Sequence, residues 1–256
     1  MKKKNIIIVT ISLLVLIASY FGYKGFYLYR YTNGGVFVDE YYNDSIDKLK
    51  FEGTEVINRI NIFEDEYLSF SNLKIRNEFT ELIKLDEGND KYVRYLLRDE
   101  DDNLIASFAM GNEGYTLVDL FGHDEITTYG TDENESFEKI DRNSILKDNN
   151  IIDDIDLLQY LAKNKNRKSN IFTSIKEMGE IYANQLFVSI MIPKGNIILL
   201  NGDYTGYAYD IVSDKGYIKE YHILYNGESY FFQFVWKDDY FNDEKIKDLL
   251  ATIVID

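Results

Sequence analysis

The chain contains no cysteine and only two histidines among its 256 residues. Without cysteine it cannot form disulfide bonds, zinc–thiolate sites, iron–sulfur clusters or thiol nucleophiles, and it cannot carry a cysteine-linked lipid anchor. Two histidines restrict general acid–base catalysis near neutral pH, where the ordinary pKa of histidine lies. No nucleophile-elbow, P-loop or H-E-x-x-H sequence occurs. We therefore assign no catalytic, cofactor-binding or metal-ligating residue, and we predict that the protein is not an enzyme.

Basic residues are scarce beyond the N-terminus. Residues 1–24 hold four of the 28 lysines and arginines and no acidic residue, so the rest carries 24 basic and 44 acidic residues, a net charge of −20. Such an acidic surface repels phosphate backbones, which excludes nucleic acid as a partner. The single proline and the bias toward Ile, Lys, Asn, Tyr and Asp are typical of AT-rich genomes, as in many Gram-positive bacteria. We therefore expect a bacterial protein.

The longest uncharged run lies at the N-terminus. Residues 6–23 are eighteen residues without a charge, and a helix of that length spans about 27 Å, close to the ~30 Å hydrocarbon core of a bilayer. Three lysines at positions 2–4 precede it, which predicts a cytoplasmic N-terminus and an exported remainder. A signal peptide cleaved near Ser19 is the alternative and would make the protein secreted, although Ile17 and Tyr20 fit a small-x-small cleavage site poorly.

The rest of the chain predicts an α+β fold of mostly antiparallel sheet with packing helices, preceded by one transmembrane helix. We divide the chain into a membrane anchor (1–24), a tether (25–50), a β-rich meander unit (51–140) and an α+β unit (141–256). In the meander unit, β-prone runs at 79–86, 91–98, 104–111 and 115–121 alternate with polar turns.

Helices and strands both occur in the second unit. One apolar stripe at helical spacing predicts a helix over 151–161, and Ser174 with Glu177 forms a capping box that opens another. Five β-prone runs follow, at 186–193, 196–202, 204–212, 217–225 and 228–236. Asn242 is expected to begin a last helix whose buried face holds Ile246, Leu249, Leu250 and Ile253.

A ligand patch is predicted from the register of one hairpin. Asn226 and Gly227 form a two-residue turn signal, which places His222 opposite Phe231 and Glu220 opposite Gln233. Glu220, His222 and Gln233 then share one sheet face and could bind a small polar ligand or a metal. A solvated outer sheet face explains the same pattern.

Two acidic stretches suggest metal chemistry only weakly. Residues 99–104 (DEDDNL) could bind calcium loosely, but they lack the glycine and the final glutamate of an EF-hand loop, so a hairpin turn is the simpler interpretation. Residues 123–125 (HDE) lack the cysteine partners of the zinc-deaminase motif, and a polar loop is expected.

One basic cluster, KNKNRK at 163–168, stands out in the acidic exported part. Lys163, Lys165, Arg167 and Lys168 follow a predicted helix, where cations complement the negative end of the helix dipole. Alternatively, these four residues could contact an envelope protein, headgroups or an anionic cell-wall polymer.

These features predict a membrane-anchored extracytoplasmic binding or interaction module of a Gram-positive-like cell envelope. The rival hypothesis is a cell-wall glycan hydrolase with a carboxylate pair, which rests on location and acid content alone.

Overall fold

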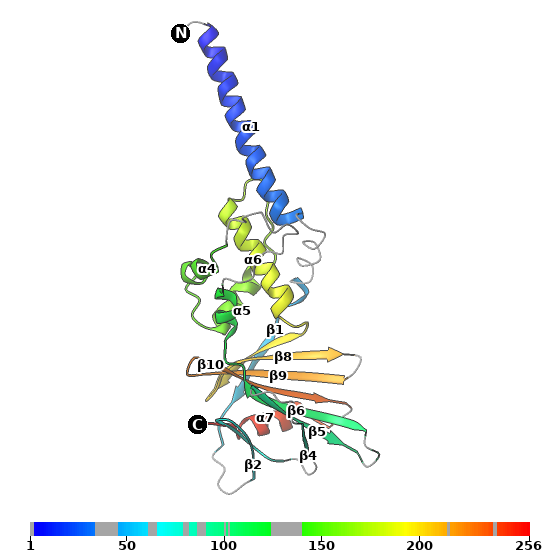
Figure 1. The fold of residues 1–256 in the computed structure, drawn as a ribbon. Helices are drawn as coiled ribbons and strands as arrows, with labels where there is room; N and C mark the ends of the chain where they lie inside the picture. The colour runs from blue at the N-terminus through cyan, green and yellow to red at the C-terminus, as the bar shows by residue number, and fades with distance from the viewer. Residues whose placement is uncertain are drawn as a thin grey trace.

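A computed structural model provides the structure of the chain. It describes residues 3–33, 46–60, 66–78, 82–85, 91–99, 101, 103–123, 140–213, 216–237 and 240–256. These residues form a long N-terminal helix and a layered body, in which a large sheet separates a group of helices from a smaller sheet with one helix (Figure 1). The predicted α+β class with one apolar N-terminal helix is confirmed.

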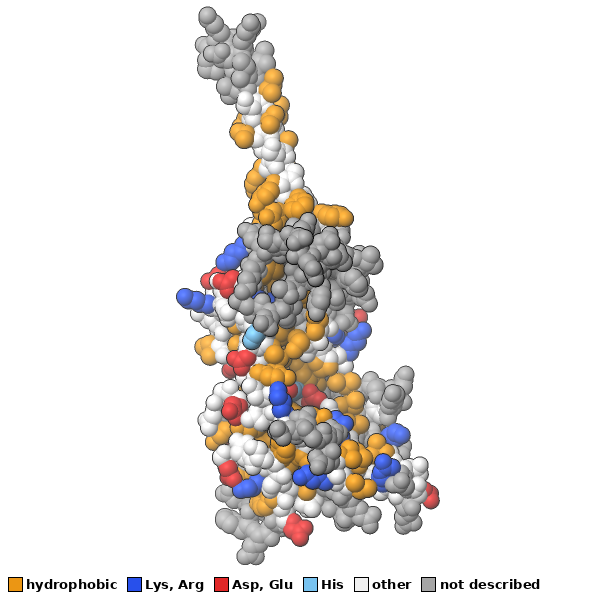
Figure 2. Space-filling model, in the orientation of Figure 1, with side chains coloured by type: hydrophobic (Ala, Val, Ile, Leu, Met, Phe, Trp, Pro, Cys, Tyr) orange, Lys and Arg blue, Asp and Glu red, His pale blue; other side chains and the backbone are white. Residues whose placement is uncertain are grey.

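The first helix projects away from the body. α1 (Lys3–Asn33) stands clear of the sheets for most of its length and packs against α6 (Ile175–Met191) near its C-terminal end. Hydrophobic side chains lie along the projecting part (Figure 2). The helix continues to Asn33, past residue 25 where the predicted tether begins, because residues 26–33 contain neither proline nor glycine.

Strands from both predicted units join in one eight-stranded sheet. Its order is β1-β7-β8-β9-β10-β6-β5-β4. The members are β1 (Lys50–Ile57), β4 (Leu82–Leu85), β5 (Tyr92–Arg98), β6 (Leu104–Asn112), β7 (Asn196–Gly202), β8 (Thr205–Ser213), β9 (Gly216–Tyr225) and β10 (Glu228–Trp236). Only the β1–β7 pair is parallel among these strands. The predicted boundary at residues 140 and 141 therefore divides the sequence but not the sheet.

One face of this sheet packs on α7 (Asp243–Leu250) and on a small sheet. The small sheet has the order β11-β3-β2, formed by β11 (Val254–Ile255), β3 (Leu73–Arg76) and β2 (Tyr67–Phe70). Asn242 caps α7 by accepting a bond from the Lys245 amide at 2.8 Å, as predicted. The four apolar residues predicted for this C-terminal segment are all buried: Ile246, Leu249, Leu250 and Ile253.

Helices cover the other face at the β7–β9 end. They are α3 (Leu117–Gly122), α4 (Arg142–Asp148), α5 (Asp154–Asn164) and α6. A second hydrophobic core joins them to the sheet, with Phe121 and Phe187 from helices meeting Ile197 and Tyr207 from strands. Along β5 and β10, by contrast, every second residue on this face stays partly exposed.

The β9–β10 hairpin confirms the predicted register. Tyr221 pairs with Phe232, His222 with Phe231 and Glu220 with Gln233. Asn226 and Gly227 have φ angles of 53° and 82°, as a type I′ turn requires. The strands expected at 196–202 and 228–236 also have the predicted bounds.

Two predicted strands are helices. The run 115–121 forms α3, because Thr116 and Asp119 make a reciprocal capping box at its start. The run 186–193 continues α6 as far as Met191. Phe187 and Val188 are buried there in the core against the sheet, whereas Ile190 is 56% exposed. Short apolar runs fit a strand or a buried helix equally well, so their sequence did not decide between the two.

Candidate functional site

The structure brings the predicted ligand patch together and adds a second glutamate to it. The imidazole Nε2 of His222 lies 2.9 Å from Glu220 Oε1, and Nδ1 lies 3.3 Å from Glu113 Oε2. Gln233 Nε2 donates to the other oxygen of Glu220 at 2.6 Å. We call these four residues, Glu113, Glu220, His222 and Gln233, the imidazole cluster.

This cluster is not on a solvated face, so that interpretation of His222 is wrong. His222 is 5% exposed. Its ring stacks on Tyr207 of β8 with centroids 4.7 Å apart and an angle of 14°, and Tyr209 meets it edge-on at 5.5 Å. Tyr207 and Tyr209 belong to the core between the sheet and the helices, so the helical layer buries this part of the face. The cluster lies where that layer ends, since both glutamate side chains keep 25% exposure.

Glu113 escaped the sequence analysis because no local pattern connects it with His222. It directly follows β6, and its amide donates to the Ser229 carbonyl of β10 at 3.0 Å. The order β9-β10-β6 therefore brings the carboxylate to a histidine 109 residues later in the chain. Only the pairing of distant strands reveals this contact.

Asp154 extends the polar region into the helical layer. Its Oδ1 accepts the Val118 amide of α3 at 2.9 Å, and its Oδ2 accepts the Tyr207 hydroxyl at 3.4 Å. Burial raises the pKa of Asp154, whose side chain lies beneath the helices. The hydroxyl of Tyr209 is buried and has no hydrogen-bond partner among the described residues.

His222 carries a positive charge at neutral pH. Burial opposes protonation, but the hydrogen bonds and charges of Glu113 and Glu220 outweigh burial and raise the pKa of His222 to about 9. For Glu220, burial works against ionisation, yet the bond to His222 prevails and lowers the pKa of this carboxyl. The cluster is thus an imidazolium held between carboxylates, and it connects β9 to the segment that follows β6.

This geometry does not suit the metal site that the sequence suggested for the patch. The rival carboxylate-pair hydrolase needs one acid whose pKa is raised so that it can protonate the leaving group; the pKa of Glu220 is lowered, so Glu220 is not such an acid. Both ring nitrogens of His222 face carboxylates, so neither points to solvent. In the described part of the chain, no group of three or more His, Asp or Glu residues is arranged to hold a metal ion.

The predicted basic cluster is divided by the structure, and two of its cations make internal contacts. Lys165 Nζ donates to the carbonyls of Ile46, Lys48 and Leu49 at 3.1–3.3 Å. Burial lowers the pKa of this amine. Its side chain therefore holds the segment before β1, although Lys165 is also the C-cap residue of α5.

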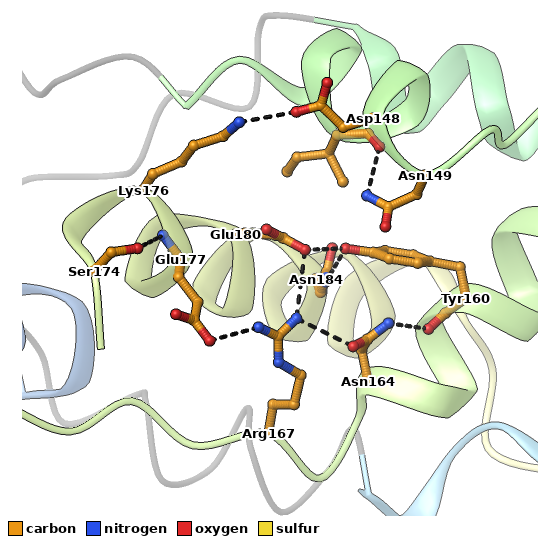
Figure 3. Close-up of polar contacts among 11 residues, drawn as sticks. Asp148, Asn149, Tyr160, Asn164, Arg167, Ser174, Lys176, Glu177, Glu180 and Asn184 are labelled. Carbon is orange, nitrogen blue, oxygen red and sulfur yellow. Dashed lines mark hydrogen bonds and ion pairs between the residues drawn. The ribbon is translucent and has the colours of Figure 1, made fainter. Parts of the chain in front are cut away.

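Arg167 belongs to a network between α5 and α6 (Figure 3). Its guanidinium donates to Glu177 Oε1 at 2.7 Å and lies 3.5 Å from Glu180 Oε1. Tyr160 donates to the same Glu180 oxygen at 2.5 Å. Ser174 caps α6 as predicted, by accepting the Glu177 amide at 3.2 Å. Lys163 and Lys168 remain exposed.

The first acidic stretch forms a turn where it is described, and only the first residue of the second stretch is described. The Asp99 carboxylate accepts the amides of Asp101 and Asn103 at 3.0 and 2.8 Å, and the Asn103 bonds lower its pKa. This confirms the hairpin turn between β5 and β6. His123 follows α3 and is exposed, whereas residues 100, 102, 124 and 125 lie outside the described residues.

Comparison with protein-family models, with curated protein sequences and with solved structures finds no match to this chain.

Proposed function

We propose that the protein is a membrane-anchored extracytoplasmic module of a Gram-positive-like bacterial envelope, and that it binds a partner without catalysing a reaction. The observation that carries this proposal is the exposed apolar surface of α1. The segment Thr10–Tyr29 has a mean hydropathy of 1.4, and 6% of it is buried. Six of its aliphatic residues are 45–67% exposed: Ile11, Leu13, Leu14, Val15, Leu16 and Ile17.

An apolar helix of this kind is unfavourable in water but fits a lipid bilayer. Large contiguous apolar surfaces on soluble proteins mark sites that another phase or partner covers. A single helix with apolar side chains on all sides finds such an environment in a membrane. The three lysines at positions 2–4 favour a cytoplasmic N-terminus, which would put the acidic body outside the cell.

Binding is favoured over catalysis by the state of the polar groups. Both ring nitrogens of His222 are in contact with carboxylates inside the imidazole cluster. The lowered pKa of Glu220 keeps its carboxyl group ionised. The exposed cations Lys163 and Lys168 are then the candidate contacts for an envelope protein or an anionic cell-wall polymer. Lys165 and Arg167 fix the segment that carries these two lysines. Lys165 donates to main-chain carbonyls before β1, and Arg167 donates to Glu177 of α6.

The orientation can be tested on intact protoplasts. We would express the full chain with different epitope tags at the two termini and treat the protoplasts with a nonspecific protease. The proposal predicts loss of the C-terminal tag and survival of a short membrane fragment with the N-terminal tag. A fully protected chain would contradict the orientation. A soluble body in the medium would show cleavage and secretion instead.

Partner binding can be tested by photo-crosslinking in cells. A photoreactive amino acid at position 163 or 168 should give an adduct, while the same probe at Lys84 should not, since Lys84 is an exposed lysine on β4 at the opposite edge of the sheet. Equal adducts from all three positions, or none, would contradict a partner site near the end of α5. Release of reducing ends from peptidoglycan that depends on Glu220 would support the hydrolase instead.

A further inference from the structure

A turn before α6 displays an exposed aromatic side chain in a fixed position. The Asn170 amide donates to Thr173 Oγ1 at 3.0 Å, and the Phe172 amide donates to Asn170 Oδ1 at 2.8 Å. Ser174 then caps α6. Despite this ordered backbone, the Phe172 side chain is 81% exposed. We call residues 170–173 the aromatic turn.

The aromatic turn lies against α1. The rings of Phe21 and Phe172 meet edge to face with centroids 6.5 Å apart. One turn further along α1, a β-carbon built on Gly25 would lie 4.0 Å from Ile171 Cδ1. Figure 1 shows α6 beginning beside the lower part of α1, with the large sheet on the far side of the helices. The aromatic turn is therefore at the end of the body that faces the projecting part of α1.

Helix geometry places this contact at the membrane surface. From Lys4 to Lys24, α1 rises about 30 Å, the thickness of a hydrocarbon core. If the bilayer ended before Phe21, the core would be spanned by about 25 Å of helix, which is too short. The bilayer must therefore reach the level of Lys24, which puts Phe21 roughly 4.5 Å inside its edge. The ring of Phe172, which meets Phe21 with centroids 6.5 Å apart, therefore lies close to this edge.

We propose that the aromatic turn is a second membrane contact, in which Phe172 inserts into the lipid interface of the outer leaflet beside α1. This inference rests on the proposed anchoring by α1. Aromatic side chains favour the interface between headgroups and acyl chains. The occupant is lipid and not protein, because the turn is continuous with the surface of α1 that the bilayer covers. With two contacts, the body keeps its helical layer toward the membrane and its large sheet away from it.

Depth-dependent fluorescence quenching tests this inference. The full chain contains one tryptophan, Trp236, whose spectrum can be subtracted. We would reconstitute Phe172→Trp in phosphatidylcholine vesicles with brominated acyl chains. Leu14→Trp reports on the middle of the Lys4–Lys24 part of α1. Ile152→Trp is the matched control, because Ile152 is 82% exposed but lies in the turn before α5 and not beside α1. All three sites are exposed, so folding should tolerate the substitutions.

The expected result is a blue-shifted emission from Phe172→Trp that is strongly quenched by bromine near the carbonyl end of the chains. Leu14→Trp should be quenched by bromine near the chain ends, and Ile152→Trp should stay unquenched. Quenching of Leu14→Trp without quenching of Phe172→Trp would overturn the second contact and leave the anchor intact. If Leu14→Trp is not quenched, anchoring itself is wrong. Equal quenching at positions 152 and 172 would overturn the assignment to the aromatic turn.

Discussion

Replacing His222 by glutamine should remove a pH dependence from the stability of the fold. In the wild-type protein the imidazolium lies between Glu113 and Glu220, and the pKa of His222 is about 9. His222→Gln keeps a polar side chain of similar size but cannot carry the charge. The difference between the two proteins therefore reports the stabilisation that depends on protonation of this ring.

The magnitude follows from the two pKa values. An increase from the ordinary 6.5 to about 9 corresponds to about 3 kcal/mol of stability at low pH. Because the folded pKa lies above the unfolded one, the contribution is complete below about pH 6.5 and is lost as the pH rises through 9. Within that interval the slope should approach 1.4 kcal/mol per pH unit.

Urea unfolding of the full chain in nonionic detergent provides the measurement. Trp236, on β10 beside β9, is 8% exposed and should change its emission on unfolding. We expect wild-type stability to fall by about 3 kcal/mol between pH 6.5 and 9.5. His222→Gln should show little change over the same interval and should be the less stable protein at pH 6.

A control variant separates the two histidines. His123 is exposed at the end of α3, so His123→Gln should retain the full slope of the wild-type protein. If His222→Gln retained that slope as well, another group would be responsible, and the imidazole cluster would not hold a charged ring. A wild-type stability that is flat from pH 6.5 to 9.5 would refute the raised pKa itself.

Three further predictions test other parts of the structure. Gly227→Val should destabilise the fold by roughly 1–3 kcal/mol through strain at φ 82°, and an unchanged melting temperature would argue against the type I′ turn. Lys219 is 1% exposed and its Nζ lies 3.1 Å from Glu55 Oε1. Lys219→Met should therefore lower the free energy of unfolding by about 3–5 kcal/mol. An unchanged free energy in urea unfolding would show that the ion pair is dispensable. Lys165→Gln should lower the stability by about 1–2 kcal/mol through lost bonds to three carbonyls, whereas Lys163→Gln should change it by less than about 0.5; equal effects of the two would contradict their different environments.

The elements predicted correctly are those whose signals are local. A two-residue turn sets the register of its own hairpin, so Asn226 and Gly227 were sufficient to pair β9 with β10. Caps act over three residues, which is why Ser174 and Asn242 marked the starts of α6 and α7. The apolar runs 115–121 and 186–193 fit a strand or a helix, and the prediction of a strand is wrong for both. The capping box at Thr116 starts α3 in the first run, and the second run continues α6.

The sequence by itself therefore determined the apolar N-terminal helix, the α+β class, the hairpin register and the placement of Glu220, His222 and Gln233 on one sheet face. Only the tertiary structure decided that this face is buried, that Glu113 reaches His222, and that Lys165 binds the main chain before β1. The hydrogen bonds of His222 to Glu113 and of Lys165 to the main chain join residues more than a hundred positions apart. Such partners are set by the packing of whole layers, which produces no periodic pattern in the sequence around either partner.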